Sequence, residues 1–201
     1  GSEMCIRDSS YYDPASHGVK FSGMVDDLKA AKAGDVVLLH GCCHNPSGAD
    51  LTLEQWSVIA DMAIAQGFTV LVDLAYQGMG QGLAEDVAGL RLLATRLGEL
   101  IVAASCSKNL GLYRERTGAA LFYGKDTQTA AATQSHGLGA ARRVYSMPPA
   151  HGALLAGRVL STPELRASWE AELSQICRRT ISLRTQLSDK LSAKTDRDFS
   201  F

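Results

Sequence analysis

The chain has 201 residues, of which 46% are hydrophobic and 20% charged. This composition is typical of a globular protein and excludes a disordered or fibrous one. Twenty Lys and Arg residues face 21 Asp and Glu residues, for a net charge of -1, so the chain lacks the basic excess that binding to nucleic acid or an anionic membrane needs. No apolar run approaches the roughly 18 residues of a membrane span. We therefore expect no nucleic-acid partner and no membrane.

Residues 1–9 follow neither helical nor strand periodicity, and we interpret them as a cloning or processing remnant. The next clear element is a short apolar run over residues 36–40, bounded by glycines, which predicts a buried strand. A helix is expected over residues 52–67, because Thr52 and Gln55 have the spacing of a capping box and Gly67 stands where the helix should stop.

The same pattern then repeats along the chain. The sequence predicts a strand over residues 68–73, a helix over 84–97, and two further strands over 100–105 and 119–123. Strands that alternate with helices of this length favour βαβ units. The predicted fold class is therefore α/β, with a mostly parallel sheet flanked by helices; the direction of the fourth strand stays open.

Helical patterning dominates the remaining residues. Residues 127–141 are rich in Ala, Thr, Gln and Gly and predict either a weak helix or a loop, whereas residues 150–160 predict a helix. From Thr162-Pro163 to about residue 193, apolar side chains at three-to-four spacing predict one long helix that lies along a surface or bridges two domains. The last residues, 198–201, alternate like a strand that is just beginning, which suggests a fragment of a longer protein.

The cysteines and histidines do not predict a metal site. The cysteine count is odd and there is no C-x-x-C pair, so we expect reduced thiols and a cytoplasmic location. None of the histidines has acidic or cysteine partners at metal-ligand spacing, and we expect that the adjacent Cys42 and Cys43 cannot easily both face one metal. The glycines at positions 78, 80 and 82 lack the full spacing of a dinucleotide-binding loop.

Polar side chains follow three of the predicted strands, and parallel strands present their carboxyl ends at one edge of a sheet. An ionised Asp73 at the end of an apolar run is costly unless a cation pairs with it, but it could also cap the next turn. Lys108, directly after a strand, could be an amine nucleophile or an ordinary surface lysine. Asn45, before a proline, could donate to a ligand or only form a turn.

Four motifs in this order resemble the aspartate/aromatic-amino-acid aminotransferases, which are class I, fold-type I pyridoxal-phosphate enzymes. They are H-N-P-S-G at 44–48, D-L-A-Y-Q-G at 73–78, S-C-S-K-N-L-G-L-Y-R-E-R-T-G at 105–118 and Y-S-M-P-P-A-H-G at 145–152. The resemblance runs from about Tyr11 to Phe201. It implies pyridoxal 5'-phosphate as the cofactor and a homodimer whose sites are shared between subunits.

The resemblance also implies the catalytic roles. Lys108 would form the Schiff base with the cofactor and then carry the proton at the substrate α-carbon. Asp73 would pair with the protonated pyridine nitrogen and keep the ring an electron sink. Tyr76 and Asn45 would hydrogen-bond the phenolic oxygen of the ring, and Asn45 would also lie next to the substrate.

The remaining roles concern phosphate and substrate. Ser105 and Arg116 would hold the cofactor phosphate, with Ser107 as a weaker candidate. Arg142 occupies the position of an arginine that, in this family, reaches into the partner subunit and reads a substrate carboxylate; Arg143 is the neighbouring alternative.

The resemblance implies transamination between an amino acid, aspartate or aromatic or both, and a 2-oxo acid such as 2-oxoglutarate. Residues 10–160 would be part of a large cofactor-binding domain, and residues 161–201 an interdomain helix with the start of a small domain. We expect the fragment alone to be inactive, because groups of both missing ends must converge on the site. The alternatives are another fold-type I pyridoxal-phosphate reaction and a non-catalytic scaffold.

Overall fold

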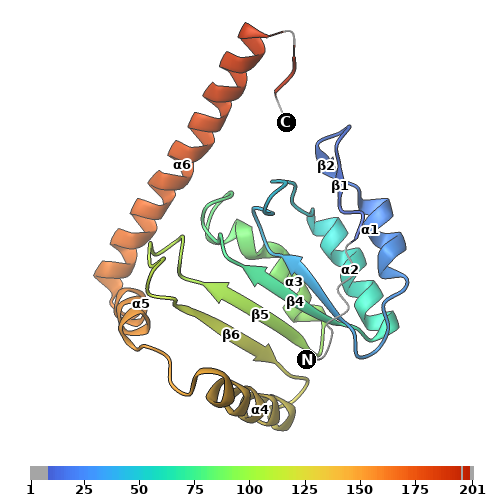
Figure 1. The fold of residues 1–201 in the computed structure, drawn as a ribbon, viewed down its shortest axis with the longest axis vertical. Coiled ribbons are helices and arrows are strands. Elements are labelled where there is room, and N and C mark those ends of the chain that lie inside the picture. The colour runs from blue at the N-terminus through green and yellow to red at the C-terminus, as the bar shows by residue number, and fades with distance from the viewer. Residues whose placement is uncertain (1–8, 196, 200–201) are drawn as a thin grey trace.

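The computed structural model describes residues 9–195 and 197–199. Its centre is a four-stranded sheet of order β3-β4-β5-β6, in which β3, β4 and β5 are parallel and β6 is antiparallel to β5 (Figure 1). The predicted α/β class is confirmed, and the open question about the fourth strand is resolved as a reversal. The strands are β3 (Val36–His40), β4 (Thr69–Leu74), β5 (Leu100–Ser105) and β6 (Gly118–Tyr123).

The core lies between the sheet and the helices that connect its parallel strands. Alternate residues of β4 are buried, as a strand with one face packed requires. They contact α2 (Leu53–Gln66) and α3 (Ala88–Arg96), and the short 3₁₀ helix η1 (Glu85–Val87) precedes α3. The capping box at Thr52 and the left-handed Gly67 that ends α2 are both present. The helix expected over residues 84–97 is thus two elements, a 3₁₀ helix over 85–87 followed by an α-helix over 88–96.

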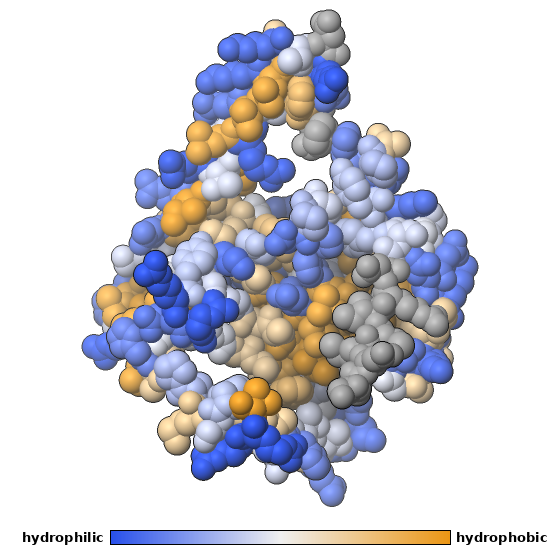
Figure 2. All heavy atoms as spheres, viewed as in Figure 1, coloured by the Kyte–Doolittle hydropathy of each residue, from blue (hydrophilic) through white to orange (hydrophobic). Residues whose placement is uncertain are grey.

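The opposite face of the sheet is less covered. Val36 and Leu38 of β3 are more than half exposed, and every residue of β6 is exposed. Figure 2 shows apolar side chains gathered over the strands on this face. A face of this kind in a larger protein is normally covered by other parts of the molecule.

The second half of the described chain is helical. The three helices are α4 (Thr127–Tyr145), α5 (His151–Ser161) and α6 (Pro163–Lys194). Residues 127–141 are therefore helix and not loop, since the side chain of Asp126 caps the first turn by accepting from the backbone N–H of Thr129. The long predicted helix is confirmed, and it projects past the sheet (Figure 1). Only Leu173 and Cys177 of its apolar positions are buried.

Three elements near the start were not predicted, namely β1 (Tyr12–Asp13), β2 (Gly18–Val19) and α1 (Phe21–Leu28). At the other end, Asp198 and Phe199 are not in a strand, so the strand expected there is not seen in them; Ser200 and Phe201 lie outside the described residues. Of the interpreted remnant, only Ser9 is described. Among the described residues, no helix is both long and apolar enough to cross a lipid bilayer.

Candidate active site

Three predicted side chains meet at the carboxyl edge of the parallel strands. Asn45 follows β3, Tyr76 follows β4 and Lys108 follows β5. The amide Nδ2 of Asn45 is 3.5 Å from the hydroxyl of Tyr76, and the Nζ of Lys108 is 4.5 Å from the centre of the Tyr76 ring. The topology therefore brings an amine, a phenol and an amide from three separate loops into one place.

The loop that carries Asn45 is held by side chains that the sequence reasoning missed. The backbone N–H of Asn45 donates to Nδ1 of His40, at 3.2 Å. The backbone N–H groups of Cys43 and His44 donate to the carboxylate of Asp50, at 2.7 and 2.8 Å. His40 ends an apolar strand and pairs in register with Asp73, so a polar residue at the end of such a strand was the signal that could have identified it.

Asp73 lies in β4, between His40 of β3 and Ala103 of β5. Its backbone carbonyl accepts from the N–H of Gly41, at 2.8 Å. Its side chain is half-buried, and within the described residues its carboxylate has neither a hydrogen bond nor an ion pair. A partly desolvated carboxylate of this kind is suited to a cationic or N–H partner from a ligand. The alternative, a cap on the following turn, is not what this side chain does.

The predicted phosphate-binding residues are close to one another along a closed loop. The hydroxyl of Ser105 accepts from the backbone N–H of the buried Ser107, at 3.1 Å. The N–H of Cys106 donates to the carbonyl of Thr117, at 3.0 Å, which brings the backbone of the neighbouring Arg116 to the same end of the loop. The backbones of Ser105, Ser107 and Arg116 thus lie at the same end of this loop, and their binding of a phosphate stays a prediction.

Arg116 itself is exposed and has a left-handed backbone, with φ of 51°. Its Nη1 donates to the carbonyl of Tyr113, at 2.8 Å. A guanidinium has five N–H donors, so most of its donors stay available to an anion. A strained non-glycine φ often marks a functional position.

Arg142 and Arg143 are not brought to this group. Both lie in the last turn of α4 and are exposed, and in the described part of the chain neither side chain contacts Asn45, Tyr76 or Lys108. The structure does not choose between the two arginines.

Asn109 and Trp169 are two further residues that the sequence analysis did not assign. The indole Nε1 of Trp169, on α6, donates to the backbone carbonyl of Asn109, at 2.7 Å. The side chain of Asn109 donates to the carbonyl of Gln77, at 3.3 Å, while its Oδ1 is buried without a partner among the described residues. The residue next to Lys108 is therefore fixed both to the loop after β4 and to α6. No local sequence signal marks such a contact, because its partners are 32 and 60 residues apart in the chain.

The family Aminotransferase class I and II matches residues 2–201. The chain belongs to this family. The resemblance of the four sequence motifs to the aspartate/aromatic-amino-acid aminotransferases is therefore confirmed at the level of the family.

Individual relatives agree with this assignment. The chain is 53% identical over 186 residues to an aromatic-amino-acid aminotransferase of Paracoccus denitrificans, covering 92% of this chain and 47% of the relative. It is 46% identical over 197 residues to an aspartate aminotransferase of Escherichia coli (strain K12), covering 98% of this chain and 50% of the relative. The chain spans about half the length of these curated relatives.

A solved structure extends the likeness to the fold. An aromatic-amino-acid aminotransferase from Burkholderia pseudomallei, covalently bound to pyridoxal phosphate, matches 96% of this chain and 48% of its own at 39% identity and a TM-score of 0.92. An aromatic amino acid aminotransferase with 3-indolebutyric acid matches 94% of this chain and 48% of its own at 52% identity and a TM-score of 0.90.

The donor set of this chain fits pyridoxal phosphate on its own geometry. A primary amine lies against a phenol ring, and on the adjacent strand lies a carboxylate that has no partner among the described residues. Two hydroxyls and an arginine stand at the end of the next loop. An aldehyde, a basic ring nitrogen and a phosphate need these three kinds of group.

Proposed function

We propose that the protein to which this chain belongs is a pyridoxal-phosphate-dependent aminotransferase. It moves an amino group between an amino acid, aspartate or aromatic or both, and a 2-oxo acid such as 2-oxoglutarate. The observation that carries the proposal is the position of Lys108, whose Nζ lies 4.5 Å from the centre of the Tyr76 ring. Asp73 lies at the same edge, and in the part of the chain that the structure describes its carboxylate has no partner. A binding scaffold would need neither the amine nor this carboxylate.

Each residue has a defined task in this proposal. When bound, pyridoxal phosphate supplies an electron sink for charge that develops on the substrate. Lys108 binds the cofactor through its amine, and the same Nζ takes the proton from the substrate α-carbon and returns it. Asp73 holds a proton on the ring nitrogen through its carboxylate. Tyr76 and Asn45 donate hydrogen bonds to the ring oxygen, and their mutual contact orients both donors.

The cofactor phosphate would be held by Ser105, Ser107 and Arg116. The backbone N–H of Ser107 fixes the direction of the Ser105 hydroxyl, and Arg116 adds a planar positive fork. Arg142, or Arg143 in its place, is proposed to read a substrate carboxylate in the site of a second subunit, so the complete protein is proposed to be a homodimer. The exposed position of both arginines in α4 is compatible with this role.

The domain division remains part of the proposal. Residues 10–160 would be a partial large domain, and 161–201 an interdomain helix with the start of a small domain; this is supported by α6, which leaves the sheet (Figure 1). The chain alone is proposed to be inactive, since it spans about half of its relatives. The expected cytoplasmic location stays a prediction, because relatives include enzymes named as mitochondrial and chloroplastic.

The test uses the full-length protein, the variant Lys108→Ala and the matched control Lys125→Ala, whose lysine is exposed in the turn after β6. The absorption spectrum with pyridoxal phosphate is recorded before and after L-aspartate or L-phenylalanine is added. We expect the lysine-bound form in the wild type and the control but not in Lys108→Ala, with conversion to the amine form by at least one amino acid. Which amino acid converts it decides the preference.

Two results would contradict the proposal. If the wild type shows no covalently bound cofactor, the protein is a non-catalytic scaffold. If the cofactor binds through Lys108 but no amino donor converts it, the reaction is a different one of the same cofactor class.

A further inference from the structure

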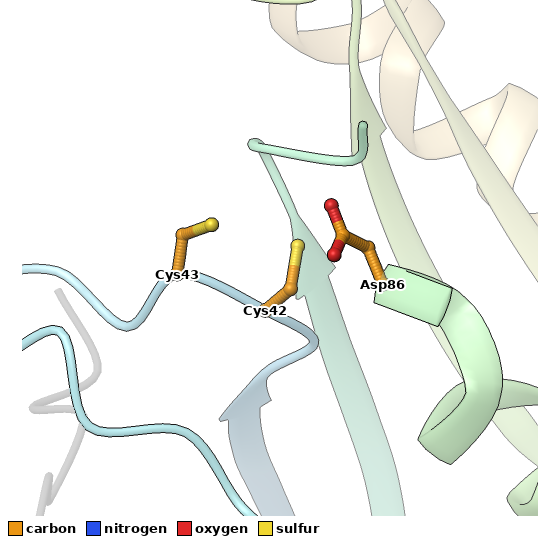
Figure 3. A group of neighbouring side chains, drawn as sticks. All are labelled: Cys42, Cys43 and Asp86. Atoms are coloured by element: carbon orange, nitrogen blue, oxygen red, sulfur yellow. The ribbon is translucent and has the colours of Figure 1, made fainter. Parts of the chain in front are cut away.

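A second cluster of reactive side chains comes from the loop after β3 and from η1. Figure 3 shows the thiols of Cys42 and Cys43 and the carboxylate of Asp86, with the Cys42 sulfur next to both of the others. One ligand atom from each residue lies within 4.8 Å of those from the other two. Cys42 and Asp86 are buried, and Cys43 is half-buried.

This arrangement corrects the expectation that adjacent cysteines cannot face one point. In an extended chain, neighbouring side chains point in opposite directions. Cys43 instead has a left-handed backbone, with φ of 48°, and this turn places its sulfur on the same side as that of Cys42. The Asp50 carboxylate fixes the turn by accepting from the N–H of Cys43.

The carboxylate of Asp86 is oriented by the glycine-rich loop 78–82. Its Oδ2 accepts from the backbone N–H groups of Gly78 and Gly80, at 2.8 and 3.0 Å. Its Oδ1 accepts from Gln81 at 2.7 Å and only distantly from Gly82, at 3.4 Å. A metal ion at Oδ1 would replace the longer of these two bonds, and carboxylates that ligate metals are commonly held by hydrogen bonds from outside the site.

Gly80 packs directly against two of the ligand atoms. A Cβ added at Gly80 would lie 2.7 Å from Oδ1 of Asp86 and 3.1 Å from Sγ of Cys43, so a side chain at this position would displace them. Beside it, the thiol of Cys177 on α6 donates to the carbonyl of Gly80, at 3.3 Å. A hollow of about 240 Å³ lies between the glycine-rich loop and α6, lined by Gly78, Gln81 and Cys177 among others.

We propose that Cys42, Cys43 and Asp86 form a binding site for one thiophilic divalent metal ion of the Zn²⁺ type. Two sulfurs and one carboxylate oxygen are ligands that such ions accept in tetrahedral sites. With metal–sulfur bonds of about 2.3 Å, tetrahedral sulfurs lie about 3.8 Å apart, so small side-chain rotations from the present positions are enough. On binding, both thiols release their protons to solvent and become thiolates.

The charges around the cluster are compatible with this ion. Two thiolates and the Asp86 carboxylate exceed the charge of a divalent cation by one. The guanidinium of Arg184, on α6, opposes this remaining negative charge, whereas the carboxylate of Asp50 adds to it.

The test is titration of the full-length protein with Cd²⁺ under reducing conditions, in the absence of pyridoxal phosphate. The thiolate-to-cadmium absorption in the ultraviolet and the bound metal after dialysis are measured. We expect one ion per chain, with at least a tenfold loss of affinity in Cys42→Ser and in Cys43→Ser. The matched control Cys106→Ser, which removes a thiol on another loop, should bind as the wild type does. Asp86→Asn tests the third ligand.

A second measurement keeps the test decisive if a variant does not fold. The wild type is alkylated with iodoacetamide, with and without Cd²⁺, and the modified cysteines are located by mass spectrometry. Protection of the half-buried Cys43 but not of Cys106 supports the site. Equal alkylation of Cys43 with and without metal, or metal binding retained in folded Cys43→Ser, overturns the proposal.

Discussion

The hydrogen bond from Trp169 to the carbonyl of Asn109 links α6 to the residue that follows Lys108. In Trp169→Phe the aromatic ring is largely kept, but the donor at 2.7 Å is lost. A neutral hydrogen bond contributes about 0.5 to 1.5 kcal/mol, and a buried carbonyl left without its partner costs about 1 to 3 kcal/mol. We therefore expect the described conformation of the Lys108 loop to be destabilised by about 2 kcal/mol. Its population relative to conformations without this contact then falls about thirtyfold.

Two assays follow this change in the full-length protein. Titration with pyridoxal phosphate should show cofactor binding weakened by up to the same thirtyfold. In the variant, part of the binding free energy is spent on ordering the Lys108 loop, which the wild type already holds in place. Urea unfolding should show a lower midpoint. Trp56→Phe is the matched control, since Trp56 lies in the core under α3 and has no contact with Lys108. The control should lose stability while its cofactor affinity is unchanged. Equal cofactor affinity in Trp169→Phe and the wild type would refute this reasoning.

Three further predictions concern packing, capping and pH. Gly89→Ala places a Cβ 2.5 Å from Cδ1 of the buried Trp56, so overpacking should lower the free energy of unfolding by about 1 to 3 kcal/mol. In the control Gly157→Ala the new Cβ meets open space, so the free energy of unfolding should be unchanged or higher. The midpoints of urea unfolding compare the two variants. Thr52→Ala removes the capping box of α2 and should cost about 1 kcal/mol in the same assay; an unchanged midpoint would show that the cap is dispensable. Burial, and then the charge of His40, lower the pKa of His44 from 6.5, so the folded state binds fewer protons than the unfolded state. The contribution of neutral His44 to the free energy of unfolding is therefore present above pH 6.5 and is lost as the pH falls through the folded pKa. Between pH 5 and about 7, the unfolding midpoint of His44→Gln should depend less on pH than that of the wild type.

Much of the fold could be predicted because its signals are local. The strand at 36–40 has its predicted bounds, since an apolar run flanked by glycines leaves little choice. Helix α2 follows its capping box and its terminal glycine for the same reason. The β1–β2 pair was missed because two-residue strands have no periodicity to detect.

The candidate site could be predicted less completely. Polar residues at strand ends marked Asp73 and Lys108, because the topology of a parallel sheet alone brings such positions together. The roles of Trp169 and Asp86 depend on contacts that α6 and the glycine loop make in three dimensions, and neither has a pattern in the sequence. The two sulfurs of Cys42 and Cys43 lie on the same side because Cys43 has a positive φ, and a cysteine at that position does not predict such a backbone angle.

The hydrogen bonds from α6 to the loops after β4 and β5 can form only late during synthesis. The donor for the Asn109 carbonyl comes 60 residues after it, and the thiol that donates to Gly80 comes 97 residues after that glycine. At ribosomal rates of about 5 to 20 residues per second, these loops wait about 3 to 20 s for their partners to be made. During that time the loop that carries Lys108 has its own internal hydrogen bonds and the bond from Asn109 to Gln77, but not yet its bond to α6.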